Sequence, residues 1–153
     1  MYWVDLFGDS YAKIIHLGIP IRDPDIFIPW DLNESDFIGI FQEKNVIKVV
    51  EKGYFVRDIT FLGEKHCNMG VYFKETLRRI AFSRDSYNDY NDILMSYNAF
   101  QVALKKAFGK PDKRKSIETD FQSCEWNISS NITICHYVIN RFGLEEHMFI
   151  EHK

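Results

Sequence analysis

The chain has 153 residues, of which 46% are hydrophobic and 27% are charged, so we expect a single domain over residues 1–153 with an apolar core. Its net charge is -3, and no basic cluster is longer than the Lys-Arg-Lys at 113–115, which argues against a nucleic-acid-binding protein. No apolar run approaches the roughly 18 residues of a membrane span, the first residues do not resemble a signal peptide, and three cysteines without framework spacing fit a reducing cytoplasm.

The first predicted element is a short helix that ends at Gly18. A glycine readily adopts the left-handed conformation that follows many helices, and Pro20 cannot continue a helix. Ser10 or Asp9 would cap its start. The apolar residues recur at helical spacing and are Tyr11, Ile14, Ile15 and Leu17.

A loop that ends at Asp36-Phe37 follows, and short apolar segments after it predict strands. These segments cover 38–42, 46–50 and 54–62, with a turn at 43–45 and a break at Gly53 between them. Two further strands are predicted over 69–75 and 77–83. Because sequential strands joined by short turns pair antiparallel, these segments predict an antiparallel sheet.

A second helix is predicted to end at Gly109 and to cover at least Tyr97 to Phe108. Ser96 is a good N-cap for this helix, although its start could lie as early as Tyr87. Basic residues at 105 and 106 fall in the last turn, where the helix dipole favours cations. The apolar stripe consists of Ile93, Tyr97, Phe100, Leu104 and Phe108.

After Pro111 comes a charged loop that ends at Asp120-Phe121, and then strands are predicted over 122–126, 132–139 and 144–152. Each half of the chain therefore shows a helix, a loop and three strands, which indicates a structural pseudo-repeat. The expected fold class is α+β, with helices packed on a curved antiparallel β-sheet. The residues expected to be buried together in the core are Phe100, Leu104, Trp126 and Ile134.

The strongest candidates for chemistry are Cys124, His136 and His147. A two-residue turn at 129–130 would place Cys124 opposite Cys135, whereas a three-residue loop at 129–131 places Cys124 opposite His136. Only the three-residue loop puts the apolar residues on one face and the polar residues on the other, so we prefer that register.

The next hairpin decides whether His147 joins the other two. A four-residue turn at 140–143 places His136 opposite His147, which would complete a Cys-His-His cluster suited to zinc. A loop that is one residue longer pairs His136 with Met148 and Ile134 with Ile150, which gives a better core. Because the metal site requires the poorer register, we expect no metal and no other cofactor.

Other adjacent pairs do not suggest catalysis. The sequence has no phosphate-binding loop, nucleophile elbow, zinc-protease motif or dinucleotide fingerprint. His66 and Cys67 are neighbours, as are Glu145 and Glu146, but neighbours in a strand point to opposite faces. We interpret Cys67 as a small buried cysteine in a loop and both glutamates as solvated, and we assign no catalytic residue.

The segment over 83–92 has the composition of a protein-binding surface, because it combines tyrosines with short polar and acidic side chains. The tyrosines would act as anchors from one face of a helical turn, and the carboxylates would favour a basic partner. The alternative is the solvated first turn of a helix, where acids are also favourable. The candidates for partner contact are Asp85, Tyr87, Asp89, Tyr90 and Asp92.

The chain resembles the immunity proteins of bacterial toxin systems, including those of contact-dependent growth inhibition. The resemblance is carried by the small size, the acidic charge, the helix that ends in Phe-Gly-Lys-Pro at 108–111, the strand with Trp126 and the closing strands. It implies a cytoplasmic, non-enzymatic protein that binds a cognate toxin domain, often a nuclease, with neither nucleic acid nor a membrane as partner. The alternative function is a small metal-binding protein or Cys/His-dependent enzyme that uses Cys124, His136 and His147.

Overall fold

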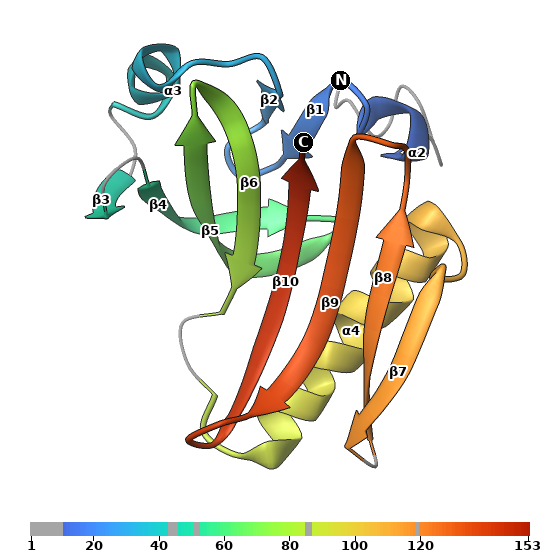
Figure 1. Ribbon diagram of the computed structural model, residues 1–153. Coiled ribbons are helices and arrows are strands. Elements are labelled where there is room, and N and C mark those ends of the chain that lie inside the picture. The colour runs from blue at the N-terminus through green and yellow to red at the C-terminus, as the bar shows by residue number, and fades with distance from the viewer. Residues whose placement is uncertain (1–10, 43–45, 51–52, 85–86, 119) are drawn as a thin grey trace.

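The computed structural model describes residues 11–42, 46–50, 53–84, 87–118 and 120–153. Its helices are α2 (Tyr11–Ile14), α3 (Glu34–Phe41) and α4 (Tyr90–Phe108) (Figure 1). Its strands are β1 (Gly18–Ile21), β2 (Ile26–Pro29), β3 (Val46–Val50), β4 (Gly53–Phe61), β5 (Glu64–Lys74), β6 (Thr76–Ser83), β7 (Lys113–Glu118), β8 (Phe121–Asn127), β9 (Ile132–Asn140) and β10 (Leu144–His152). The predicted α+β class with an antiparallel sheet is confirmed.

The main sheet consists of two four-stranded meanders that meet edge to edge. Strands β3 to β6 pair in sequence order, as do β7 to β10, and the last strands of the two meanders, β6 and β10, pair antiparallel in the middle. The strand order is therefore β3-β4-β5-β6-β10-β9-β8-β7. Each meander follows a helix, α3 or α4, so the predicted pseudo-repeat of a helix and three strands is corrected to a helix and four strands.

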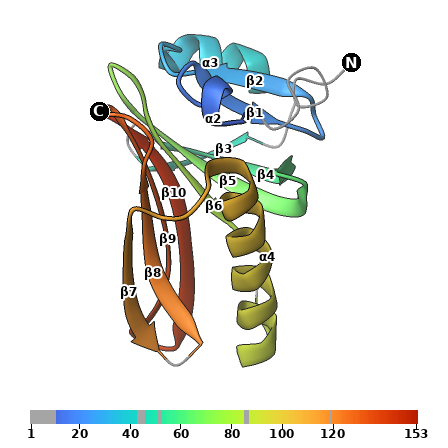
Figure 2. The same ribbon diagram turned by 90° about the vertical axis from the view of Figure 1, so that its right-hand side faces the viewer.

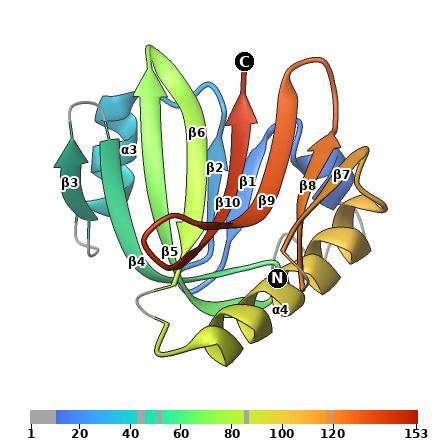
Figure 3. The ribbon, with the colours of Figure 1, turned by 60° about the horizontal axis from the view of Figure 1, so that its bottom comes forward.

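The helices and the small β1–β2 hairpin cover the same face of the bent sheet. Figure 2 shows α4 alongside β8–β10, with α2, α3 and the hairpin across the first meander, and Figure 3 shows α4 running obliquely below the strands. Phe37 of α3 packs against Tyr54 of β4 and Phe73 of β5, with ring centroids 5.5 and 5.4 Å away. The opposite face of β8–β10 is partly exposed, because buried and half-buried residues alternate along these strands.

The hairpin registers follow the apolar pattern of the sequence. Cys124 pairs with His136 across β8 and β9, and His136 pairs with Met148 across β9 and β10, so both preferred registers are confirmed. The predicted core is confirmed too, because the same buried cluster contains four side chains that are each at most 1% exposed, Phe100, Leu104, Trp126 and Ile134.

Local signals define both ends of α4. The N-cap is Asp89, whose side chain accepts a hydrogen bond from the backbone N–H of Asp92. Gly109 ends the helix as predicted, with φ +81°, and its N–H donates to the carbonyl of Lys105. Ser96 lies inside the helix, so its prediction as N-cap is wrong. No helix in the described part of the chain, α4 included, has the length and apolarity needed to cross a membrane.

Gly18 does not end a helix, contrary to the prediction. Helix α2 stops at Ile14, and Gly18 is the first residue of β1, where it pairs with Pro29. A Cβ atom at Gly18 would lie 2.3 Å from the carbonyl oxygen of Ile28. The residue is therefore glycine because two backbones approach closely here, and not because the chain needs a left-handed conformation.

Residues 38–41, predicted as part of a strand, belong to α3. Asn33 caps this helix by accepting a hydrogen bond from the N–H of Asp36 at 2.8 Å. Phe37 and Phe41 lie one helical turn apart, and both are fully buried. The sequence prediction is wrong because a short apolar segment such as 38–42 resembles a strand, whereas Ile38 is in fact exposed on the helix surface.

Strand β7 falls within the stretch predicted as a charged loop. It forms one edge of the main sheet, and its residues 113–115 are Lys-Arg-Lys. Charged side chains are favourable on an edge strand because they discourage pairing with other chains. The basic cluster of the sequence is therefore explained by its position at the sheet edge.

Candidate functional site

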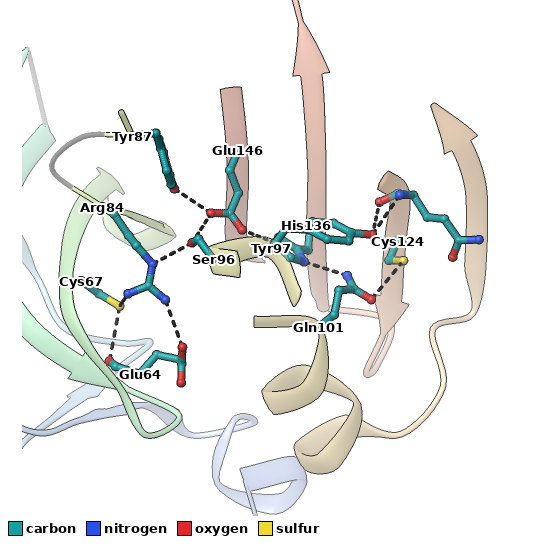
Figure 4. A network of polar contacts seen from close by, with 11 residues as sticks. Glu64, Cys67, Arg84, Tyr87, Ser96, Tyr97, Gln101, Cys124, His136 and Glu146 are labelled. Atoms are coloured by element: carbon teal, nitrogen blue, oxygen red, sulfur yellow. Dashed lines mark hydrogen bonds and ion pairs between the residues drawn. The ribbon is translucent and has the colours of Figure 1, made fainter. Parts of the chain in front are cut away.

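A network of polar side chains crosses the interface between α4 and the sheet (Figure 4). Side chains from α4 point toward side chains on the inner surface of β8, β9 and β10. The network extends from there to residues of β5 and of the segment after β6. We call this set the α4 polar network. Its members are Glu64, Cys67, Arg84, Tyr87, Ser96, Tyr97, Gln101, Cys124, His136 and Glu146.

Glu146 is the common acceptor of the network. One carboxylate oxygen accepts hydrogen bonds from the hydroxyls of Ser96 at 2.5 Å and Tyr87 at 2.6 Å. The other oxygen lies 2.8 Å from Nε2 of His136. Burial raises the pKa of Glu146, but the hydrogen bond and the charge interaction with His136, together with the two hydroxyl hydrogen bonds, outweigh burial, so its pKa lies below the ordinary value of 4.5. Glu146 is therefore a buried carboxylate whose charge is stabilised by three donors.

The neighbours of His136 assign its tautomer. Its Nδ1 lies 2.7 Å from the amide nitrogen of Gln101, which can only donate, so Nδ1 accepts and Nε2 carries the proton donated to Glu146. The amide oxygen of Gln101 then accepts from the thiol of Cys124 at 3.7 Å. The imidazole also stacks on Tyr97, with ring centroids 4.7 Å apart. Both nitrogens of the ring are therefore used.

Arg84 connects the network to the surface. It donates to the hydroxyl of Ser96 at 2.7 Å, to the carboxylate of Glu64 at 3.0 Å and to the backbone oxygen of Lys65 at 3.0 Å. Its guanidinium also lies over the ring of Phe100, 4.7 Å from the centroid. Because these contacts come from several directions, Arg84 is held in one position although 22% of its side chain is exposed.

A pocket of about 330 Å³ opens beside this arginine, and we call it the Arg84 pocket. Four of its residues come from one face of α4, and the others come from β5 and from the segment between β6 and α4. Met95 is 72% exposed and forms an apolar part of the rim. The residues that line the pocket are Glu64, Arg84, Tyr87, Asp92, Met95, Ser96 and Ala99.

The thiols of the network are not arranged as nucleophiles. Cys124 is 1% exposed, and its sulfur contacts Gln101. A catalytic cysteine needs a base within hydrogen-bond reach and access to substrate. Cys67 is fully buried, as predicted, but it lies in β5 and not in a loop, and burial raises the pKa of its thiol to about 11. This thiol therefore stays protonated at neutral pH.

His147 does not join Cys124 and His136. Because β10 places Met148 opposite His136, His147 points to the other face of the sheet, where it stacks on Tyr137 at a centroid distance of 5.1 Å. Among the described residues, no group of three or more His, Cys, Asp or Glu side chains is arranged to hold a metal ion. The zinc cluster considered from the sequence is therefore not formed by these three residues.

The interpretation of Glu146 as a solvated residue is wrong, because only 9% of it is exposed. Its position two residues before Met148 and four before Ile150 puts it on the inner face of β10, and this spacing is the signal that could have revealed it. Ser96 and Gln101 lie next to the apolar stripe of α4 and carry a similar signal. Arg84 lies outside these elements, in the segment after β6, so no local sequence pattern predicts its place in the network.

The residues predicted for partner contact lie in different settings. Asp85 is outside the described residues. Tyr87 precedes α4 and turns inward to Glu146, whereas Tyr90 begins the helix and is 44% exposed, so the expectation that they share a helical face is wrong. Asp89 caps α4, and Asp92 accepts a hydrogen bond from the N–H of residue 88 at 2.9 Å. Their role in partner contact stays a prediction.

The start of α4, the β7–β8 turn and the β9–β10 turn lie at the same end of the molecule (Figures 1 and 2). The hydroxyl of Tyr90 donates to Asp120 of the β7–β8 turn, and its ring meets Phe121 edge-on. Phe142 of the β9–β10 turn is 96% exposed. We call this surface the acidic end and define it as Asp89, Tyr90, Asp92, Asp120 and Phe142.

Comparisons with protein-family models, with curated proteins and with solved structures found no match to this chain. The resemblance to immunity proteins thus rests on the sequence features described above.

Proposed function

We propose that the chain is a non-enzymatic immunity protein that binds and neutralises a cognate bacterial toxin domain through the acidic end. The observation that carries this proposal is a contrast in exposure. The reactive types of side chain at Cys124 and His136 are buried and bonded within the α4 polar network, whereas aromatic and acidic side chains are exposed together at one end. In this proposal the protein acts in the cytoplasm, without a cofactor.

The charge of the acidic end suits a basic partner. The carboxylates of Asp89, Asp92 and Asp120 come from two separate segments that meet there. The neighbouring cation Arg141 is paired with Glu145 at 2.9 Å, so it leaves the negative charge of the acidic end in place. A nuclease toxin needs a basic surface to hold phosphates, and an acidic surface would attract it and compete for the same groups.

Two aromatic side chains can anchor such a partner. Phe142 is almost fully exposed, and burying a phenylalanine side chain is worth about 1.5–3 kcal/mol. Tyr90 is already oriented by its contacts with Asp120 and Phe121, so it loses little conformational freedom on binding. Aromatic residues of this kind are common among those that dominate binding energy.

Co-expression tests the proposed function. Each reading frame next to the gene would be expressed under tight control, with and without this protein, and growth would be followed. We expect one product to arrest growth alone, the arrest to be relieved by this protein, and the purified pair to form a complex. If no neighbouring product is both toxic and bound, the proposed function is wrong.

A further inference from the structure

We infer that the Arg84 pocket receives a basic side chain, arginine or lysine, from the protein partner. This inference rests on the proposed function and adds a defined subsite to it. Asp92 belongs both to the acidic end and to the lining of the pocket, so the two surfaces are continuous. Tyr87, which the sequence suggested as a contact residue, would then act from the wall of the pocket.

The fixed charges around the pocket favour a cation. Glu64 and Asp92 line it, and the carboxylate of Glu146 lies directly behind the hydroxyls of Ser96 and Tyr87. Arg84 supplies the opposing charge, so three carboxylates against one guanidinium give a net charge of -2. An arriving ammonium or guanidinium would reduce this imbalance.

Polar groups of the wall still have acceptor capacity. Arg84 bonds to Oε1 of Glu64, which leaves Oε2 for a second donor among the described contacts. The hydroxyl of Tyr87 gives its proton to Glu146, so its oxygen can accept a hydrogen bond from the ligand. Arg84 itself stays on the wall, because Ser96, Lys65 and the Phe100 ring also hold it.

The size and the apolar rim of the pocket fit one long side chain. A volume of about 330 Å³ is at the lower end of the roughly 300–1,000 Å³ seen for ligand pockets. Met95 and Ala99 lie one turn apart on α4 and offer an apolar wall to a methylene stem. Lysine and arginine bury such stems against apolar surface while their charged heads reach polar groups.

A titration with N-acetylargininamide, followed by NMR, tests the inference on the isolated protein. We expect saturable shifts of the Met95 methyl and the Ser96 amide, with a Kd of about 1–10 mM. Glu64→Gln and Asp92→Asn should each weaken binding at least about threefold, a modest effect typical of partly exposed charges. Asp92→Asn keeps an oxygen for the N–H of residue 88.

The control variant is Glu125→Gln, which removes a carboxylate paired with Lys113 on the opposite face of the sheet and should leave binding unchanged. Inorganic phosphate serves as the second probe. Binding of phosphate instead of N-acetylargininamide would make the pocket an anion site and overturn the inference. Chemical-shift changes scattered over other acidic residues would also overturn the inference. So would the absence of any change at about 50 mM N-acetylargininamide, a concentration well above the expected Kd.

Failure of this inference and failure of the proposed function give different results. If a toxin is neutralised but its affinity is the same for wild type and a folded Glu64→Gln variant, the inference about the pocket is wrong and the proposed function stands. If N-acetylargininamide binds at the pocket but no toxin is neutralised, the cation subsite is supported and the proposed function is wrong.

Discussion

The carboxylate of Glu146 lies 2.8 Å from the imidazole of His136, and the two side chains are only 3% and 0% exposed. A buried carboxylate without partners is very costly, because nothing replaces its hydration. Glu146 avoids this cost through donors from three places, namely β9, α4 and the segment before α4. Through Ser96, Glu146 therefore joins the sheet to α4.

Replacement of Glu146 should destabilise the fold. We expect Glu146→Gln to lower the free energy of unfolding by about 1–3 kcal/mol, because its amide nitrogen cannot accept the hydrogen bonds now made to one of the oxygens. Urea denaturation measures the loss. The matched control is Glu145→Gln on the next residue, whose half-exposed ion pair with Arg141 should contribute much less to stability than the buried carboxylate of Glu146. Equal losses in the two variants would contradict the role given to Glu146.

The same carboxylate predicts a dependence on acid. The pKa of Glu146 is lowered in the folded protein, so its contribution to stability is present above the ordinary value of 4.5 and is lost as the pH falls through the folded value. The pKa of Glu145 is also lowered, chiefly by the hydrogen bond from His147, so wild type and Glu146→Gln must be compared. We expect a shallower acid loss in the variant when urea unfolding is repeated below pH 4.5. If the free energy of unfolding fell equally steeply with pH in wild type and Glu146→Gln, this role of the Glu146 carboxylate would be contradicted.

The packing of α4 on the sheet makes Leu104 sensitive to truncation. Leu104 is 0% exposed within the main core, so Leu104→Ala should cost about 2–5 kcal/mol of stability. Val102, two residues earlier, is 69% exposed, and Val102→Ala should change stability by about 0.5 kcal/mol or less. Thermal or urea unfolding of both variants gives the comparison. A small loss of stability in Leu104→Ala would mean that α4 buries a different face.

Two glycines should respond to alanine in opposite directions. Gly18→Ala should lower the free energy of unfolding by about 1–3 kcal/mol, because its Cβ would meet the backbone of β2. Gly39 lies inside α3 and a Cβ there would meet nothing within 4 Å, so Gly39→Ala should stabilise the protein by about 0.5–1 kcal/mol. Denaturation of the two variants is the check. A neutral Gly18→Ala would contradict the close approach of β1 and β2.

Much of the sheet could be predicted from the sequence, because its apolar residues alternate and every slip of register would expose them. The partners of Cys124 and His136 were predicted correctly in this way. The prediction of a strand over 38–42 was wrong, because the short apolar segment there belongs mostly to α3, which Asn33 caps. The prediction of Gly18 as a helix stop was wrong for a different reason, because the close approach to Ile28 depends on tertiary structure, which a local glycine signal does not contain.

The candidate site was harder to predict. Glu146 is two residues before Met148, so both side chains lie on the inner face of β10. A carboxylate is usually solvated, however, so the sequence alone favours the wrong interpretation of Glu146 as a solvated residue. Only the three-dimensional arrangement shows that Ser96 and Tyr87 approach it from other elements. The acidic end likewise depends on Asp120, which is thirty positions from Tyr90 in the sequence.

Titration of the toxin domain with a variant that carries both Asp89→Asn and Asp120→Asn tests the central claim most directly. Asparagine is also a good N-cap, so Asp89→Asn removes a charge and keeps the cap of α4. We expect the double variant to bind at least about tenfold more weakly, or about 1.4 kcal/mol, and to show less salt dependence than wild type, with Glu125→Gln as the unchanged control. Unchanged affinity and salt dependence in the folded double variant would contradict the claim that the partner binds at the acidic end.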